Sequence, residues 1–367
     1  MRYIHQLNAW PKFVWDHEKI VTLLGAVRNR QGRLLGRMEA IGLHLRSEAL
    51  LQTLTLDVIK SSEIEGEILR PDQVRSSIAR KLGMNIVGLV SSDRHVDGVV
   101  EMMLDATQKF DRLLTKDRLF GWHASLFPTG RSGMRKIVAG AWRDNEQGPM
   151  QVVSGSMGRE RVHFEAPDAG RLDSEMKDFI YWFNRTKAID LVLKAGIAHL
   201  WFVTIHPFED GNGRIARAIT DMQLARADGS AERFYSMSVQ IRKERNAYYA
   251  VLEKTQKNTD MDITAWLEWF LACLDRALVT TEISLADVFR KARFWEAHPS
   301  GSINKRQRMM INRLFDGFEG KLTSSKWASI AKCSQDTALR DILELVEKRI
   351  LAKDSAGGRS TSYLLRD

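Results

Sequence analysis

The stretch His206-Pro-Phe-Glu-Asp-Gly-Asn-Gly-Arg-Ile-Ala-Arg217 joins two segments that both have a helical pattern. Residues 191–205, before it, carry one charge and predict a buried helix, and residues 215–226, after it, again predict a helix. A proline and two glycines interrupt the pattern between them. We therefore expect a loop that leads directly into the N-terminus of the second helix.

Such a loop predicts an anion site, because a helix N-terminus offers free N–H groups and a partial positive charge. Arg214 and Arg217 are three residues apart and so project from one face of the first turn. Asp210 supplies the oxygen ligand that a Mg²⁺ ion shared with phosphate oxygens requires. His206 can accept a proton near neutral pH. Together these residues predict a site for a nucleoside triphosphate with a general base beside it.

Other interpretations of the same residues are weaker. A lone histidine at a helix end is usually structural, and Gly211-x-Gly213-x-x-Ala216 also imitates a dinucleotide-binding fingerprint. That fingerprint must follow a strand, whereas the apolar stretch before it here is too long for one. A P-loop is excluded because the chain has no G-x-x-x-x-G-K-[ST] sequence.

With these residues the chain resembles the Fic proteins, whose signature is His-Pro-Phe-x-(Asp/Glu)-Gly-Asn-Gly-Arg-x-x-Arg, and every fixed position is met. The resemblance implies an enzyme that transfers AMP from ATP to a Ser, Thr or Tyr hydroxyl of a target protein, or of itself. It implies that His206 deprotonates the acceptor hydroxyl and that Asp210 holds Mg²⁺ against the α and β phosphates. The nucleotide-binding residues that it implies are Phe208 (as the anchor of the loop), Glu209, Gly211, Asn212, Gly213, Arg214 at the β phosphate and Arg217 at the γ phosphate.

A second stretch, Ser61-Ser62-Glu63-Ile64-Glu65-Gly66, predicts by itself a helix end at which Gly66 adopts the left-handed conformation. Beside a complete loop it also resembles the inhibitory motif of the family, with Ser61, Glu65 and Gly66 at the fixed positions. The resemblance implies that Glu65 pairs bidentately with Arg217 and occupies the arginine meant for the γ phosphate. The enzyme would then restrain itself, and the reverse reaction, removal of AMP, stays open.

Residues 150–155 and 161–167 predict two strands around a turn at Gly155–Gly158. In Fic proteins this hairpin is the flap that docks the target segment by strand pairing, and a plain structural hairpin is the alternative. Residues 248–256 are similar to the helix that covers the adenine, where Tyr249 would stack on the ring and Gln256 would bond its edge. An ordinary core helix is the alternative there.

The composition, 44% hydrophobic and 28% charged, predicts a soluble protein, and the length of 367 residues predicts two or three domains. The pattern along the chain predicts a mainly α-helical fold with few strands. We expect an N-terminal helical domain over residues 1–100, a Fic domain with its β-hairpin over 101–285, and a linker with a winged helix over 286–367. The two cysteines have no spacing for zinc or for a disulfide framework, which favours a cytoplasmic location. No signal pattern or membrane-length apolar run is present, so no membrane partner is expected.

Within residues 303–367 we expect a winged helix-turn-helix, with helices over 309–315, 324–331 and 335–348 and wing strands over 351–354 and 361–365 around Ala356-Gly-Gly-Arg359. Residues 300–367 hold 13 Lys and Arg against 8 Asp and Glu, a net charge of +5. The helix that would enter the DNA groove is nevertheless acidic, and its carboxylates would repel phosphates. DNA binding, protein docking and homodimerisation therefore stay open for this segment.

Three classes of function remain: a self-restrained adenylyltransferase, another nucleotidyl transfer or AMP removal on the same fold, and a DNA-binding regulator with a sensor core. The intact His206 argues against the third class, because a core without catalysis has no need of a base.

Overall fold

The computed structural model describes residues 2–86, 88–146, 148–154, 161–298, 303–315, 318, 320–354 and 361–366, without the side chains of residues 44, 287, 288 and 292. The chain divides into two compact units, Met1–Ile283 and Ser284–Asp367. Both are mainly helical, as the sequence predicted. The finer three-part division stays a prediction. Among the described residues, no helix combines the length and the apolar character needed to span a membrane.

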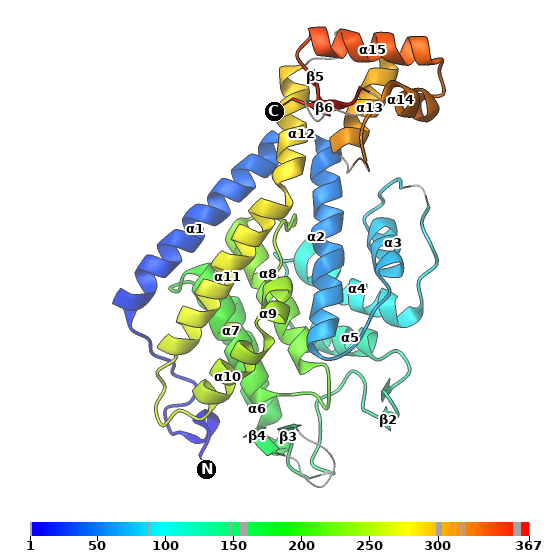
Figure 1. The fold of residues 1–367 in the computed structure, drawn as a ribbon. Coiled ribbons are helices and arrows are strands. Elements are labelled where there is room, and N and C mark those ends of the chain that lie inside the picture. Colours follow the sequence, from blue (N-terminus) through cyan, green and yellow to red (C-terminus); the bar gives the residue numbers. More distant parts are fainter. Residues whose placement is uncertain are drawn as a thin grey trace. The chain divides into compact units, whose positions relative to one another are not determined.

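The first unit is a helical assembly with three short pieces of β structure (Figure 1). Its helices are α1 (His17–Ala40), α2 (Leu43–Ile64), α3 (Pro71–Lys81), α4 (Arg94–Gln108), α5 (Lys116–Leu126), α6 (Leu172–Arg185), α7 (Leu191–Ile205), α8 (Asn212–Asp228), α9 (Met237–Lys243), α10 (Arg245–Gln256) and α11 (Thr264–Ser284), with 3₁₀ turns at Ile4–Gln6 and Ala169–Arg171. Its strands are β1 (Arg131–Ser132), β2 (Arg135–Lys136), β3 (Gln151–Ser154) and β4 (Arg161–Glu165), paired antiparallel as β1–β2 and β3–β4, besides an isolated bridge between Val14 and Asp262.

Helix α7 forms the centre of this unit, as its apolar sequence predicted. Every residue from Val192 to Ile205 is buried, and α7 packs along α8. Figure 1 shows this pair enclosed by α1, α2 and α11. The side chain of Asp190 accepts a hydrogen bond from the Val192 N–H and so caps the start of α7. The one charge, Lys194, donates to the Thr186 carbonyl oxygen at 2.6 Å. The core thus fixes both helices that border the loop.

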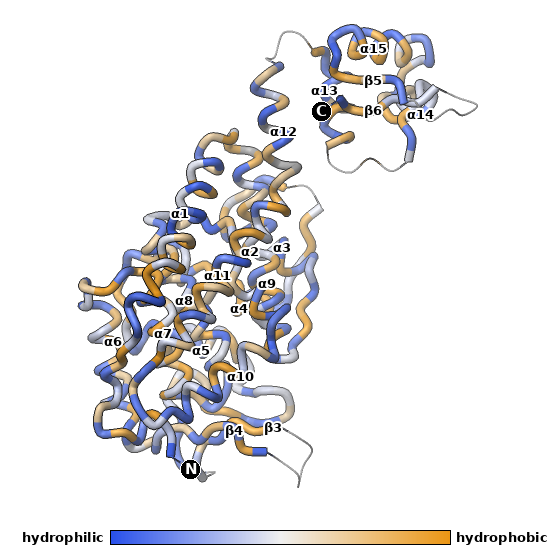
Figure 2. Tube along the Cα trace, turned by 60° about the vertical axis from the view of Figure 1, so that its left-hand side comes forward, coloured by the Kyte–Doolittle hydropathy of each residue, from blue (hydrophilic) through white to orange (hydrophobic). Residues whose placement is uncertain are grey.

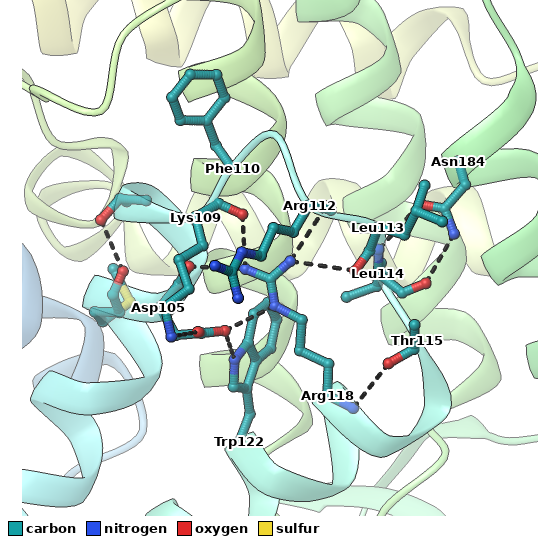
Figure 3. Close-up of polar contacts among 12 residues, drawn as sticks. Asp105, Lys109, Phe110, Arg112, Leu113, Leu114, Thr115, Arg118, Trp122 and Asn184 are labelled. Atoms are coloured by element: carbon teal, nitrogen blue, oxygen red, sulfur yellow. Dashed lines mark hydrogen bonds and ion pairs between the residues drawn. The ribbon is translucent and has the colours of Figure 1, made fainter.

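A polar network fixes the loop between α4 and α5 (Figure 3). The Arg118 guanidinium donates to the Asp105 carboxylate at 2.7 Å and to three carbonyls of the 109–113 loop. The Trp122 indole donates to the same carboxylate at 2.8 Å. Burial alone would raise the pKa of Asp105, but its hydrogen bonds hold the pKa below the ordinary value. This network sets the position of α5.

The strands β3 and β4 form the predicted hairpin, with a bulge between Val152 and Val153. Phe164 turns inward and packs against Tyr3 near the N-terminus. On the other side His163 Nδ1 lies 2.7 Å from a Glu253 carboxylate oxygen, which ties the hairpin to α10. The predicted turn at Gly155–Gly158 lies outside the described residues.

The second unit holds three helices in the order that the sequence predicted, preceded by α12 (Ala286–Ala297) and followed by two paired strands. These elements are α13 (Lys305–Phe315), α14 (Ser324–Ala331), α15 (Gln335–Glu347), β5 (Leu351–Lys353) and β6 (Tyr363–Leu365). Their apolar faces surround the buried Trp327. Helix α13 begins four residues before the predicted start, because the Asn304 side chain accepts from the Gln307 N–H and caps it.

The winged-helix assignment of this unit stays a prediction, and its wing turn at residues 356–359 lies outside the described residues. Figure 2 shows hydrophobic and hydrophilic residues interleaved along α15. Its inner face buries Ala338, Ile342 and Leu345, whereas Leu339 and Leu343 are exposed.

Candidate functional site

The loop between α7 and α8 is held by its own side chains. Phe208 is fully buried and stacks on the His123 ring with 4.2 Å between centroids. The Asn212 side chain accepts from the Phe208 N–H at 3.0 Å and donates to the Phe208 carbonyl at 2.7 Å. Gly211 has φ = 78°, and a Cβ there would lie 2.9 Å from the Phe127 ring. The Asn212 side chain is thus engaged inside the loop, and its contact with a phosphate stays a prediction.

His206 ends α7 in the left-handed conformation, with φ = 53°. Its Nδ1 lies 3.3 Å from the Val203 carbonyl, which can only accept, so Nδ1 carries the proton and Nε2 carries the lone pair. Burial lowers the pKa of His206 to about 4, so the ring is neutral at pH 7. A neutral imidazole with a free Nε2 is the form that a general base requires.

Arg143, which the sequence did not single out, ties this loop to the exit of the hairpin. Its side chain donates to the His206 carbonyl at 2.8 Å and to the Pro167 carbonyl at 2.5 Å, and its N–H donates to the Pro207 carbonyl at 2.9 Å. Burial lowers the pKa of Arg143 to about 10, so the guanidinium stays charged at neutral pH. No local pattern marks such a residue, since all three partners are carbonyl oxygens far away in the chain.

Asp210 is held from two sides. One carboxylate oxygen accepts from the Gly211 N–H at 2.6 Å, and the other accepts from the Ser132 hydroxyl. Over the described residues no group of three or more His, Cys, Asp and Glu side chains could hold a metal ion. A single carboxylate still fits Mg²⁺, which usually takes its other ligands from phosphates and water. The neighbouring Glu209 buries a carboxylate oxygen that has no hydrogen-bond partner among the described residues.

Arg217 lies against the C-terminal end of α2. Its Nε donates to the Ser61 hydroxyl at 2.9 Å, and its Nη2 donates to the Ser61 carbonyl at 2.8 Å and to Glu65 Oε1 at 2.8 Å. Glu65 therefore meets Arg217 through one hydrogen bond and not through the expected bidentate pair, and Arg217 Nη1 is buried without a partner among the described residues. Gly66 has φ = 85° and ends the helix. The stretch 61–66 is thus both a glycine-ended helix and a contact to Arg217.

Arg214 meets a carboxylate that the sequence analysis did not include. Its Nη1 donates to Glu67 Oε2 at 2.6 Å, and the other Glu67 oxygen lies 2.5 Å from His95 Nε2. The Arg214 side chain is only 5% exposed and lies over the Phe127 ring. The sequence offered one hint of this contact, because Glu67 lies only two residues after Glu65, which was expected at the site.

The residues expected at the adenine lie on α10. Tyr249 is half-buried, with the Arg245 guanidinium 5.2 Å from its ring centroid. Gln256 is buried and donates to the Thr204 hydroxyl at 3.3 Å. Their contacts with a base stay predictions. The adjacent Tyr248 is fully engaged in the core, where its hydroxyl lies 2.9 Å from His199 Nε2.

Comparison with known proteins identifies the family. Residues 113–224 match the model of the Fic/DOC family, and residues 3–84 match a domain of unknown function, DUF4172. The central region of the chain therefore matches a Fic domain. Among curated proteins it is 31% identical over 180 residues to protein adenylyltransferase fic-1 of Caenorhabditis elegans, covering 48% of this chain and 32% of that protein. It is also 31% identical over 143 residues to protein adenylyltransferase Fic of Aedes aegypti, covering 36% and 27%. The chain spans a third or less of the length of these relatives.

Solved structures agree on the fold. A Fic family protein from Desulfovibrio desulfuricans G20 is 22% identical and superposes with a TM-score of 0.56, covering 95% of this chain and 96% of that one. A Fic domain containing signaling protein from Bacteroides thetaiotaomicron VPI-5482 is 18% identical with a TM-score of 0.50, covering 69% and 95%. At these identities the comparison supports the mainly helical Fic fold and nothing finer.

Proposed function

We propose that this chain is a protein adenylyltransferase that restrains itself. The observation that carries the proposal is the combination, at one helix N-terminus, of a neutral His206 with a free Nε2, the Asp210 carboxylate and two buried arginines. Gly211 is the N-cap of α8 and has no side chain to cap it, so the first N–H groups of the helix can donate to phosphate oxygens. The curated relatives carry the name protein adenylyltransferase, which supports the same conclusion.

In the proposed reaction the oxygen of a Ser, Thr or Tyr hydroxyl attacks the α phosphorus of ATP. His206 Nε2 takes the hydroxyl proton, a new P–O bond forms, and the bond to the bridging oxygen of the β phosphate breaks, so pyrophosphate leaves. Arg214 and Arg217 stabilise the charge on the β and γ phosphates. Asp210 would hold Mg²⁺, which supplies positive charge to the phosphate oxygens.

The restraint comes from Glu65 in this proposal. Arg217 is buried and already donates to Glu65, so a γ phosphate would have to compete with a carboxylate for the same guanidinium. ATP then binds in a pose that does not present its α phosphorus to the acceptor. A displacement of the end of α2 would separate Glu65 from Arg217 and so relieve the restraint.

The β3–β4 hairpin, residues 150–167, is the proposed docking site for the target segment. Val153 and Val162 are 48% and 40% exposed on it. A short two-stranded sheet with exposed β-branched residues can pair with an extended peptide through its edge. Arg143 donates hydrogen bonds to the Pro167 carbonyl at the end of this hairpin and to the His206 carbonyl, so one side chain holds both the proposed docking site and the proposed base in place.

The test of the proposal is incubation of the purified chain with ATP labelled at the α phosphate and with Mg²⁺. Label should appear covalently on the chain itself, and the same reaction with His206→Ala should leave none. GTP, CTP and UTP labelled in the same position serve as the controls for the nucleotide. If only a different nucleotide labels the protein, the transferred group is another monophosphate. If no nucleotide labels either the wild-type chain or Glu65→Gly, in which the restraint is removed, the adenylyltransferase proposal is wrong, and release of AMP from a modified protein becomes the reaction to assay.

DNA binding by residues 303–367 stays a proposal that α15 does not favour. A hollow on its outer face is lined by Asp336, Leu339, Arg340, Leu343, Glu344 and Glu347. Three carboxylates and two leucines against one arginine suit a protein surface better than a phosphate backbone. Protein docking or homodimerisation is therefore the preferred role of this segment. Truncation distinguishes this role from DNA binding.

A further inference from the structure

Two carboxylates at the C-terminal end of α2 contact the two arginines at the start of α8. Glu65 contacts Arg217 at 2.8 Å, and Glu67 contacts Arg214 at 2.6 Å. The first contact belongs to the proposed restraint. The second has no assigned role.

Glu67 is held in place from three directions. Its N–H donates to the Ser62 carbonyl at 3.1 Å and so continues the backbone closure of the helix end beyond Gly66. His95 of α4 lies 2.5 Å from Glu67 Oε1, and Arg214 of α8 contacts Glu67 Oε2. Burial would raise the pKa of Glu67, but the hydrogen bond from His95 and the charge of Arg214 hold it below the ordinary value, so the carboxylate is ionised at neutral pH.

Arg214 is engaged by Glu67 through one of its nitrogens. Its side chain is 5% exposed, its Nη1 is taken by Glu67, and its Nε is buried without a partner among the described atoms. A phosphate that approached the same guanidinium would meet the negative charge of Glu67 beside it. Two negative charges beside the same guanidinium repel each other strongly in a partly buried site.

We propose that Glu67 is a second restraint that acts at the β phosphate, separately from Glu65 at the γ phosphate. This inference rests on the proposed function, because it uses the same nucleotide site. Each carboxylate should therefore weaken the binding of a different set of nucleotides. Glu65 opposes only a nucleotide with three phosphates, whereas Glu67 opposes any nucleotide with at least two. Glu67 is 34% exposed, so it can leave the arginine when the end of α2 moves.

The test is titration calorimetry of the full-length chain with AMP, ADP and ATP in the presence of Mg²⁺. Glu67→Gln keeps the size of the side chain and removes its charge, so it should bind ADP and ATP about tenfold more tightly than wild type and AMP equally well. Glu65→Gln should leave the affinity for ADP within about twofold. Glu63→Gln is the matched control, because Glu63 lies on the same helix end but pairs with Lys60 and Arg242. It should change no affinity.

Weaker ADP binding by Glu67→Gln would show that Glu67 orients Arg214 for the nucleotide, and unchanged binding would show that it does nothing there; either result overturns the inference. Glu67→Ala is the second variant, and thermal melting verifies that both variants fold. The proposed function is judged separately, from the self-modification of Glu65→Gln with labelled ATP. A rise in that labelling together with unchanged ADP affinity in Glu67→Gln would disprove the role of Glu67 and still support the adenylyltransferase proposal.

Discussion

Replacing Glu65 with glycine removes the carboxylate that contacts Arg217 and leaves the two Ser61 contacts that hold the guanidinium in place. A hydrogen bond between charged groups contributes about 1.5–3 kcal/mol. Arg217 is 2% exposed but Glu65 is 31% exposed, so solvent screening places this pair at the low end, about 1.5 kcal/mol. That free energy corresponds to about tenfold in the fraction of bound ATP that adopts the productive pose.

The assay is the initial rate of self-modification with ATP labelled at the α phosphate, at saturating ATP and with Mg²⁺. Glu65→Gly should label itself at least about tenfold faster than wild type. Glu63→Gly is the matched control, since it makes the same substitution and the same charge change two residues earlier, at the end of α2, where the contacts are Lys60 and Arg242. It should label at the wild-type rate.

A rate for Glu65→Gly within twofold of wild type would refute the reasoning. The contact between Glu65 and Arg217 would then be part of the helix end alone, and the γ phosphate would not compete with it. An equal rise in Glu63→Gly would instead show that loosening of α2, and not the loss of the Glu65 charge, releases the enzyme.

Four further outcomes follow from the structure. His206→Ala should abolish AMP transfer and keep ATP binding within about twofold by calorimetry, because the base acts on the acceptor hydroxyl and not on the phosphates. Since burial lowers the pKa of His206 to about 4, the rate of wild-type transfer should stay constant from pH 8 to about 5 and fall below that. A fall in the rate that begins near pH 6.5 would contradict this. Arg217→Ala should stay near or below the wild-type rate of self-modification, because it loses the γ-phosphate contact together with the inhibitory partner. Arg118→Met should lower the free energy of unfolding by about 1.5 kcal/mol in urea titrations, because the half-buried Asp105 carboxylate loses its guanidinium and keeps Lys109 and Trp122. Removal of residues 285–367 should leave transfer intact; fluorescence anisotropy at two salt concentrations should show equally negligible duplex binding with and without them, and a salt-sensitive affinity lost on truncation would establish the DNA role.

Local sequence was enough to predict the elements that border the site. The run from Leu191 to Ile205 is apolar on every side, which only a helix in the centre of the molecule satisfies, and the structure confirms those bounds. The glycines of the loop and Gly66 mark backbone conformations that other residues avoid, so the loop and the end of α2 were also predictable. The start of α13 was wrong because a single capping asparagine outweighed the hydrophobic pattern.

The contacts of the site depended on the tertiary structure. Arg214 and Glu67 are 147 residues apart in the chain, and Arg217 and Glu65 are 152 apart. Sequence placed Glu65 near Arg217 only through a family resemblance, and it gave no sign that Ser61 would hold the same guanidinium through two hydrogen bonds. The roles of Arg143 and His123 could not be predicted from any local pattern, because Arg143 acts through carbonyl oxygens and His123 acts through ring stacking. The sequence by itself determined which backbone would bind an anion, since helix ends and glycines are local properties. Only the packing of α2 and α4 against α8 decided which side chains occupy that site, because such contacts depend on how distant helices meet.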